Sequence, residues 1–91
     1  MKNFKTLNNN NQLYINCLKI LDDGRLAVGD GNSNLIIYDN ETFNQDIIIN
    51  NNLRSLRNFT QLKNKNIACS FKSDYTLKII KIKNKTEYEN I

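Results

Sequence analysis

The chain of 91 residues contains no histidine, no proline and no tryptophan, and it has only two cysteines and three glycines. Without histidine, Cys17 and Cys69 have no imidazole partner, and their spacing is not that of metal ligands. We interpret both cysteines as small core residues and predict neither a metal site nor a cofactor. The carboxylates that a catalytic site would need fall in expected turns, where solvated acids are common. The sequence therefore predicts that the protein is not an enzyme.

Long apolar segments are also missing. No apolar stretch approaches the roughly 18 residues that a membrane-spanning helix needs. The N-terminal segment MKNFKTLNNNNQL lacks the apolar centre of a signal peptide. We therefore expect no membrane partner, reduced thiols, and a location in the cytoplasm, with the nucleus as the alternative.

One stretch has part of the pattern of an EF-hand calcium loop. Asp30, Asn32 and Asn34 alternate as its ligands would, and Glu41 follows at the last ligand position. The loop requires glycine at its sixth position, where this chain has Leu35. A turn rich in Asn and Asp explains the segment better than a calcium site.

What the chain does contain is an internal repeat. A block INCLKIL at 15–21, a turn and the pair LA at 26–27 recur 41 residues later as LRNFTQL at 56–62, a turn and IA at 67–68. A further apolar block, LIIY at 35–38, recurs as LKII at 77–80 with one extra residue in between. A period of roughly 40 to 45 residues with several short strands in each unit is typical of β-propeller blades.

Short apolar runs separated by Asn, Asp, Gly and Ser predict strands throughout. The first unit is expected to have four strands, at Leu13–Leu21, Arg25–Gly29, Asn34–Asp39 and Phe43–Ile49. The second is expected at Leu53–Phe59, Asn66–Phe71 and Thr76–Ile82, with a fourth strand after Thr86. A short strand near Phe4–Leu7 is expected to precede both units and to complete the second by exchange.

The central runs, LAV at 26–28 and LIIY at 35–38, are apolar on both faces, which indicates strands lying between two layers. The predicted fold is therefore all-β, with two four-stranded antiparallel propeller-type blades in an incomplete ring. The predicted segments are 1–12 (an N-terminal strand and an Asn-rich loop), 13–52 (repeat 1) and 53–91 (repeat 2). Closed propellers have typically four to eight blades, so two units would need further blades, more copies or a partner.

Two segments also resemble a known family. SDYTLKII at 73–80 and LDDGRLAVGD at 21–30 are similar to segments of WD-repeat propellers. In that family an Asp between the second and third strands of a blade fixes a tight turn, so the resemblance implies this structural role for Asp74 and for its counterpart Asn32. The family's Trp is replaced by Tyr38 and Ile80, and its Gly-His pair is absent.

The resemblance implies a non-catalytic protein–protein interaction module, a scaffold whose partner is another protein. We expect its contact residues in the rim loops, with Arg54, Lys72 and Tyr75 as candidates because Arg and Tyr often anchor interfaces. A homo-oligomer, or further blades, would supply the missing part of the ring.

The charge distribution supports an alternative. Residues 1–52 have four Lys or Arg against six acids, a net charge of −2, whereas residues 53–91 have nine against three, a net charge of +6. A small basic β domain could bind nucleic acid or another polyanion through Lys78, Lys81, Lys83 and Lys85. Lysines on an outer strand also protect against edge-to-edge aggregation, and we favour that reading over nucleic-acid binding. A third alternative is a fragment of a larger propeller protein.

Overall fold

A computed structural model describes residues 6, 14–31, 34–50, 56–71 and 77–91. The strands are β1 (Ile15–Ile20), β2 (Leu26–Asp30), β3 (Asn34–Tyr38), β4 (Gln45–Asn50), β5 (Leu56–Gln61), β6 (Ile67–Phe71), β7 (Leu77–Ile82) and β8 (Tyr88–Asn90). Within these residues there is no helix.

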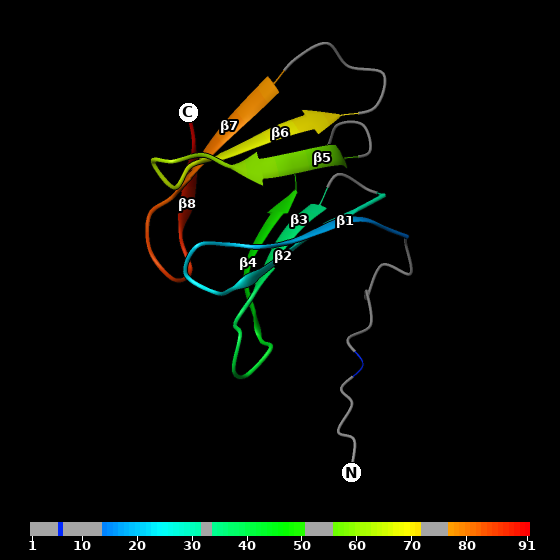
Figure 1. The fold of residues 1–91 in the computed structure, drawn as a ribbon, viewed down its shortest axis with the longest axis vertical. Helices are drawn as coiled ribbons and strands as arrows, with labels where there is room; N and C mark the ends of the chain where they lie inside the picture. The colour runs from blue at the N-terminus through cyan, green and yellow to red at the C-terminus, as the bar shows by residue number, and fades with distance from the viewer. Residues whose placement is uncertain (1–5, 7–13, 32–33, 51–55, 72–76) are drawn as a thin grey trace.

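The strands form two separate four-stranded sheets (Figure 1). In each sheet the strands follow one another in chain order, and every neighbouring pair is antiparallel. We call β1–β4 the first sheet and β5–β8 the second sheet. The predicted all-β fold with two four-stranded antiparallel units is confirmed, and the sheets are not closed into a ring.

The first hairpin of each sheet has the same turn. In the first sheet the backbone N–H of Leu21 donates to the carbonyl of Arg25 at 2.9 Å, and Gly24 has a φ of 91°. In the second sheet Leu62 donates to Asn66 at 2.7 Å, and the residue with positive φ is Lys65, at 77°. Each residue of the first turn lies 41 residues before its equivalent in the second turn, so the sequence repeat is also a repeat of backbone geometry.

A β-bulge is repeated at the same separation. The register of β1 against β2 shifts between Ile15 and Cys17, and that of β5 against β6 shifts between Leu56 and Asn58. A bulge bends a strand and increases its local twist. The two sheets are therefore bent at equivalent places.

The sheets pack against each other through β5, which lies against β1 and β2. Leu56 at the start of β5 is fully buried and packs against Gly29 of β2. The side-chain amide of Asn16 crosses the same contact and donates to the carbonyl of Leu56 at 3.0 Å. Glycine is required at position 29 because a Cβ built there would lie 2.4 Å from a methyl carbon of Leu56.

Most buried side chains form one core between the sheets, which includes Ala27, Leu35 and Ile37 from the first sheet and Phe59, Ile67 and Ile80 from the second. A smaller cluster of Val28, Ile36 and Tyr38 lies on the other face of the first sheet. The prediction that the central runs are buried on both faces is thus confirmed for β3, all of whose residues are buried.

Several predicted strand limits were wrong. β1 ends at Ile20 rather than Leu21, because Leu21 already belongs to the hairpin turn. β4 begins at Gln45 rather than Phe43, because Phe43 has a φ of 60°, which is incompatible with a strand. The second unit has its own fourth strand, β8, as predicted after Thr86. The expected strand at Phe4–Leu7 lies outside the described residues, apart from Thr6, which is in no strand.

Candidate functional site

None of the five site residues predicted from the sequence can be placed. The contact candidates Arg54, Lys72 and Tyr75 lie outside the described residues, as do Asp74 and Asn32, the predicted turn residues. The described residues nevertheless form a cleft that combines polar and apolar side chains.

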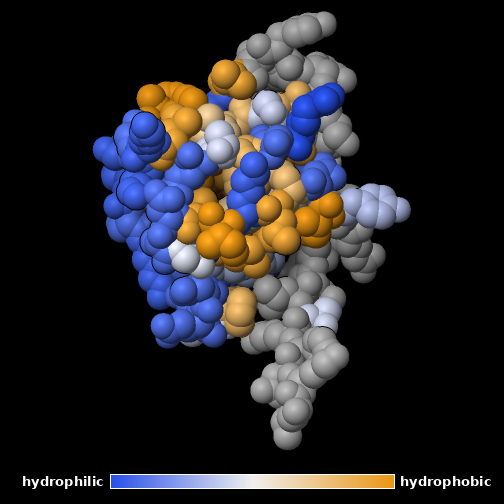
Figure 2. All heavy atoms as spheres, in the orientation of Figure 1, coloured by the Kyte–Doolittle hydropathy of each residue, from blue (hydrophilic) through white to orange (hydrophobic). Residues whose placement is uncertain are grey.

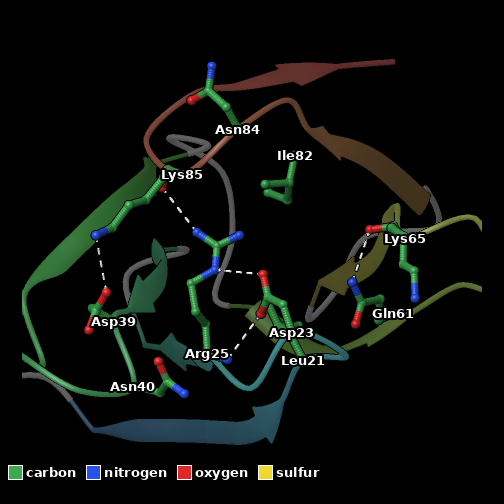
Figure 3. A pocket seen from close by; sticks show the side chains of 10 residues that line it. All are labelled: Leu21, Asp23, Arg25, Asp39, Asn40, Gln61, Lys65, Ile82, Asn84 and Lys85. Carbon is green, nitrogen blue, oxygen red and sulfur yellow. Dashed lines mark hydrogen bonds and ion pairs between the residues drawn. The ribbon is translucent and has the colours of Figure 1, made fainter.

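One hollow among the described residues is a cleft between the two sheets, with a volume of about 600 Å³. It lies at the end of the sheets where the turns β1–β2, β3–β4, β5–β6 and β7–β8 meet (Figure 3). The lining side chains are Leu21, Asp23, Arg25, Asp39, Asn40, Gln61, Lys65, Ile82, Asn84 and Lys85. The apolar members come from both sheets, so the cleft exists only because the sheets pack together.

Arg25 lies in the middle of the cleft, and its side chain is 13% exposed. Its Nε donates to Oδ2 of Asp23 at 2.9 Å, and its Nη1 donates to the backbone carbonyl of Lys85 at 3.0 Å. The first contact holds the turn, and the second joins the first sheet to the β7–β8 turn of the second. A guanidinium has five N–H groups, so it retains donors beyond these two contacts.

Lys85 closes one side of the cleft. Its Nζ lies 3.3 Å from Oδ2 of Asp39, which follows β3. Asp39 is held mainly by its own turn, where its Oδ1 accepts hydrogen bonds from the backbone N–H groups of Thr42 and Glu41, both at 2.8 Å. These backbone donors, and then Lys85, lower the pKa of Asp39 well below its ordinary value. The carboxylate is therefore charged at any physiological pH.

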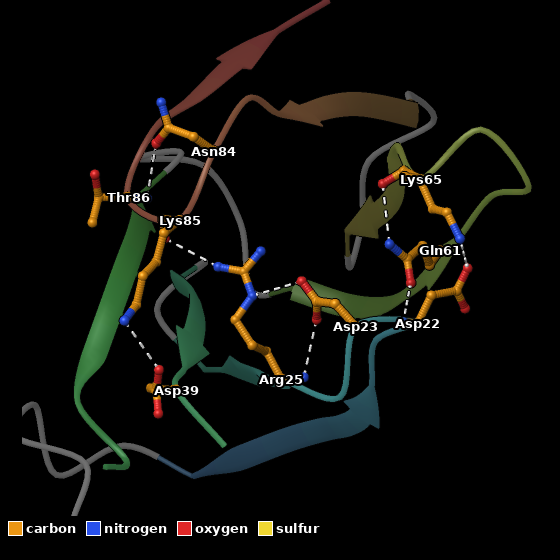
Figure 4. A network of polar contacts seen from close by, with 9 residues as sticks. All are labelled: Asp22, Asp23, Arg25, Asp39, Gln61, Lys65, Asn84, Lys85 and Thr86. Atoms are coloured by element: carbon orange, nitrogen blue, oxygen red, sulfur yellow. Dashed lines mark hydrogen bonds and ion pairs between the residues drawn. The ribbon is translucent and has the colours of Figure 1, made fainter. Parts of the chain in front are cut away.

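The opposite side is formed by Gln61 and Lys65 of the second sheet (Figure 4). The backbone N–H of Asp22 donates to Oε1 of Gln61 at 2.7 Å, and Nε2 of Gln61 donates to the carbonyl of Lys65 at 3.2 Å. Nζ of Lys65 lies 2.6 Å from Oδ2 of Asp22. Both side chains of this ion pair are more than half exposed, so it contributes little to stability.

Each cation of the cleft thus has an acidic partner: Arg25 with Asp23, Lys85 with Asp39, and Lys65 with Asp22. Such a network has little net charge but many directed donors and acceptors. Its chemistry suits the recognition of a polar, uncharged or singly charged group, such as a peptide backbone or one carboxylate. A phosphate backbone would instead be expected to bind a surface with excess positive charge.

The lysines of the last long strand do not form one surface. Lys78 lies opposite Cys69 in the register of β6 and β7, on the same face of β7 as the buried Ile80. Lys81 lies on the other face of β7, opposite Glu89 of β8. Lys85 is engaged by Asp39. The side chains proposed for polyanion binding are therefore divided between two faces and a turn.

The two thiols lie away from the cleft. Cys69 is buried in the core between the sheets, and Cys17 is half-buried against the same core. Burial raises the pKa of Cys69 to about 11 and also raises the pKa of Cys17. Both remain protonated near neutral pH, as expected of core residues and not of nucleophiles.

The described part of the chain contains no group of three or more His, Cys, Asp or Glu side chains placed to hold a metal ion. It also contains no helix of the length and apolar character needed to cross a membrane.

Comparison of the chain with protein-family models, with curated proteins and with solved structures finds no significant match. The site is therefore interpreted from its geometry.

The sequence did not point to Arg25 or Gln61, and it indicated Lys85 only as one of four lysines that could contact a polyanion. One signal was available: the chain has ten lysines but only three arginines, so an arginine beside an Asp-Gly turn is unusual here. No comparable signal marks Gln61, and the run of lysines does not indicate the contacts that Lys85 makes, because both roles depend on residues 39 to 60 positions away in the chain.

Proposed function

We propose that the protein is a non-catalytic protein-interaction module of WD-repeat-like architecture, acting in the cytoplasm or nucleus. The repeated hairpin turns and bulges, 41 residues apart, support such an architecture, as do the two four-stranded sheets packed through their first strands. In a propeller, neighbouring blades pack face to face in this way around a common axis. The two sheets would then be part of a ring that other copies or other chains complete.

The contact surface of this module is the cleft between the sheets. The observation that carries the proposal is the position of Arg25, largely buried, fixed by Asp23 and by the carbonyl of Lys85, with donors still available. A fixed guanidinium loses little conformational entropy on binding, which is one reason why Arg is frequent among residues that dominate interfaces. The apolar side chains of Leu21 and Ile82 line the same cleft.

This combination fits an extended peptide segment of a partner protein. One apolar side chain of the segment would rest on Leu21 and Ile82, and a backbone carbonyl or carboxylate would accept from Arg25. The ion pairs around the cleft disfavour a polyanion, although the net charge of +6 in residues 53–91 keeps nucleic-acid binding as the second candidate.

The two candidates can be separated by binding selection from a random peptide library. Enriched peptides should bind the wild-type chain and lose about tenfold or more in affinity to Arg25→Lys, which keeps the charge but not the forked donors. Lys63→Ala is the matched control, because Lys63 is exposed and does not line the cleft. Equal circular dichroism spectra of the variants would confirm that the fold is unchanged.

The second candidate is tested on the same samples with single-stranded DNA at about 0.15 M ionic strength. Binding that disappears on charge reversal of Lys81, Lys83 and Lys85, with no enrichment of peptides, would replace the proposal by a polyanion-binding domain. Enriched peptides that bind Arg25→Lys as well as wild type would show that the cleft is not the contact surface.

A further inference from the structure

Both sheets have a second face that does not contact the other sheet. We define the back face as the side of the first sheet away from the second, formed by Leu18, Ile20, Leu26, Val28, Ile36, Tyr38 and Ile48. We define the front face as the side of the second sheet away from the first, formed by Asn58, Thr60, Ala68, Ser70, Leu77 and Ile79.

The back face is apolar across the full width of the sheet. Leu18, Val28, Ile36 and Ile48 lie opposite one another on the four strands and form a continuous row. Val28 and Ile36 in the middle of the row are 5% and 4% exposed and are already buried, whereas the ends are open to solvent, with Leu18 60% and Ile48 52% exposed. Ile20, beside the row, is 70% exposed. Figure 2 shows a band of hydrophobic side chains across the middle of the visible face, where Figure 1 places β1. A row of this kind is typical of an interaction surface.

The repeat relates the back face to a surface that is already covered. A shift of 41 residues takes Leu18 to Phe59 and Val28 to Cys69, and both of the latter are core residues of the second sheet that face the first sheet. The back face of the first sheet is therefore equivalent, under the repeat, to the face of the second sheet that packs on the first sheet.

The same shift relates the front face of the second sheet to the face of the first sheet that contacts the second sheet. Ala27 and Gly29, the small residues of the first sheet that face the second, correspond to Ala68 and Ser70 on the front face. A hollow of about 320 Å³ is lined by these two side chains, by neighbouring residues of the second sheet and, at one side, by Lys19 of β1. Small residues at these positions leave room for an approaching sheet, as Gly29 does for Leu56.

We propose that the back face of one copy docks on the front face of a second copy, head to tail, by repeating the contact between the two sheets within the chain. Leu56, which packs over Gly29, corresponds to Ile15, so Ile15 of the first copy would lie over Ser70 of the second copy. Ile15 is half exposed in the single chain, as this arrangement requires.

The charges of the turns are complementary for this contact. The β1–β2 turn has Asp22 and Asp23, whereas the equivalent β5–β6 turn has Lys63 and Lys65. Within the chain this opposition already produces the ion pair between Lys65 and Asp22. Between copies it would bring Lys63 of one chain beside the acidic turn of the next. The inference rests on the propeller-like architecture of the proposed function, but it depends on the two faces and not on the cleft. Assembly of the chain and peptide binding in the cleft can therefore succeed or fail separately.

A head-to-tail contact generates a ring if its rotation closes. Because closed propellers have typically four to eight blades, two-sheet chains would close as two to four copies. Light scattering of the wild-type chain over a wide concentration range should therefore give a discrete mass of two to four chains. A mass of one chain at every concentration would overturn the proposal.

Two sets of substitutions test which surfaces meet. A back-face variant, Leu18→Lys with Ile20→Lys, and a front-face variant, Ser70→Arg with Leu77→Arg, should each fall to the mass of a single chain. Of these positions Leu18, Ile20 and Leu77 are well exposed in the single chain, so the fold should tolerate the changes. The control is Glu41→Lys, at an exposed position in the β3–β4 turn and outside both faces, which should assemble as wild type does.

Mixing the two variants gives the decisive result. The back-face variant retains an intact front face, and the front-face variant retains an intact back face, so the mixture should form a dimer of twice the chain mass and nothing larger. A front-face variant that still assembles alone would show that back faces pair with each other, and a mixture that stays at the mass of one chain would also contradict head-to-tail docking.

Discussion

The contact between Gly29 and Leu56 allows the packing of the two sheets to be tested quantitatively. In Gly29→Ala the new Cβ would lie 2.4 Å from Cδ2 of Leu56 and 2.6 Å from Sγ of Cys17. Leu56 is fully buried and so has little room to move. Overpacking of this kind costs about 1 to 3 kcal/mol of unfolding free energy. An alanine without a clash would instead stabilise a strand interior by about 0.5 to 1 kcal/mol, so the two cases differ in sign.

A double-mutant cycle identifies the cause. Leu56→Val shortens the side chain that clashes and should cost about 0.5 to 1.5 kcal/mol alone, as loss of one buried methylene does. The shorter side chain also makes room for the new Cβ. The double variant should therefore lose about 1 kcal/mol less unfolding free energy, or better, than the two single variants lose together. The free energies come from urea unfolding at one protein concentration, since self-association would make stability depend on concentration. Additive effects, or a stabilising Gly29→Ala, would refute the packing described for the two sheets.

Three further predictions concern the turns and the core. Gly24→Ala should lower the unfolding free energy by about 1 to 2 kcal/mol, because Gly24 has a φ of 91° that alanine adopts only with strain. Lys65→Gly, at the equivalent position of the second sheet, should leave the unfolding free energy unchanged or raise it by up to about 1 kcal/mol. Both free energies come from urea unfolding, and equal losses in the two variants would contradict the shared turn. A thiol reagent at pH 8 should modify Cys17 of the folded chain much faster than Cys69, because Cys69 is buried. The variant Cys69→Ala should lack the slow phase of the reaction. Two equally fast thiols would contradict the burial of Cys69. Because the folded pKa of Asp39 is lowered, its contribution to stability is present above its unfolded pKa of about 3.9 and is lost as the pH falls through the folded value. In Asp39→Asn the unfolding free energy should therefore fall less steeply as the pH is lowered than it does in the wild-type chain. An unchanged dependence on pH would exclude a stabilising role of the Asp39 carboxylate.

The sequence predicted the strands well because their signal is local. Apolar runs such as LIIY at 35–38, with a turn on either side, define a strand without any knowledge of the partner strand. The repeat added the number of strands in each sheet. The limit at Phe43 could not be predicted, because an aromatic residue is a favourable strand former and its positive φ is imposed by the turn that Asp39 organises.

The candidate site was not predicted, for a different reason. The cleft depends on how two sheets are placed against each other, and this placement brings Arg25 to a carbonyl 60 residues away in the chain. Neither the turn chemistry of Asp23 nor the net charge of the second half contains that information. The sequence instead directed attention to Arg54, Lys72 and Tyr75, which lie outside the described residues.

The repeat also explains why the two halves of the chain differ where they do. The turn geometry at Gly24 is retained at Lys65 despite the unfavourable φ for lysine, so the backbone is preserved while the side-chain charge changes from acidic to basic. Two units of identical charge would repel each other across their shared contact, whereas an acidic first turn and a basic second turn attract. In the proposed assembly the same asymmetry would act again at each contact between copies, because each contact would place a basic second unit beside an acidic first unit. The opposite charges of these two turns, Asp22 and Asp23 in the first and Lys63 and Lys65 in the second, are therefore explained by packing between repeats.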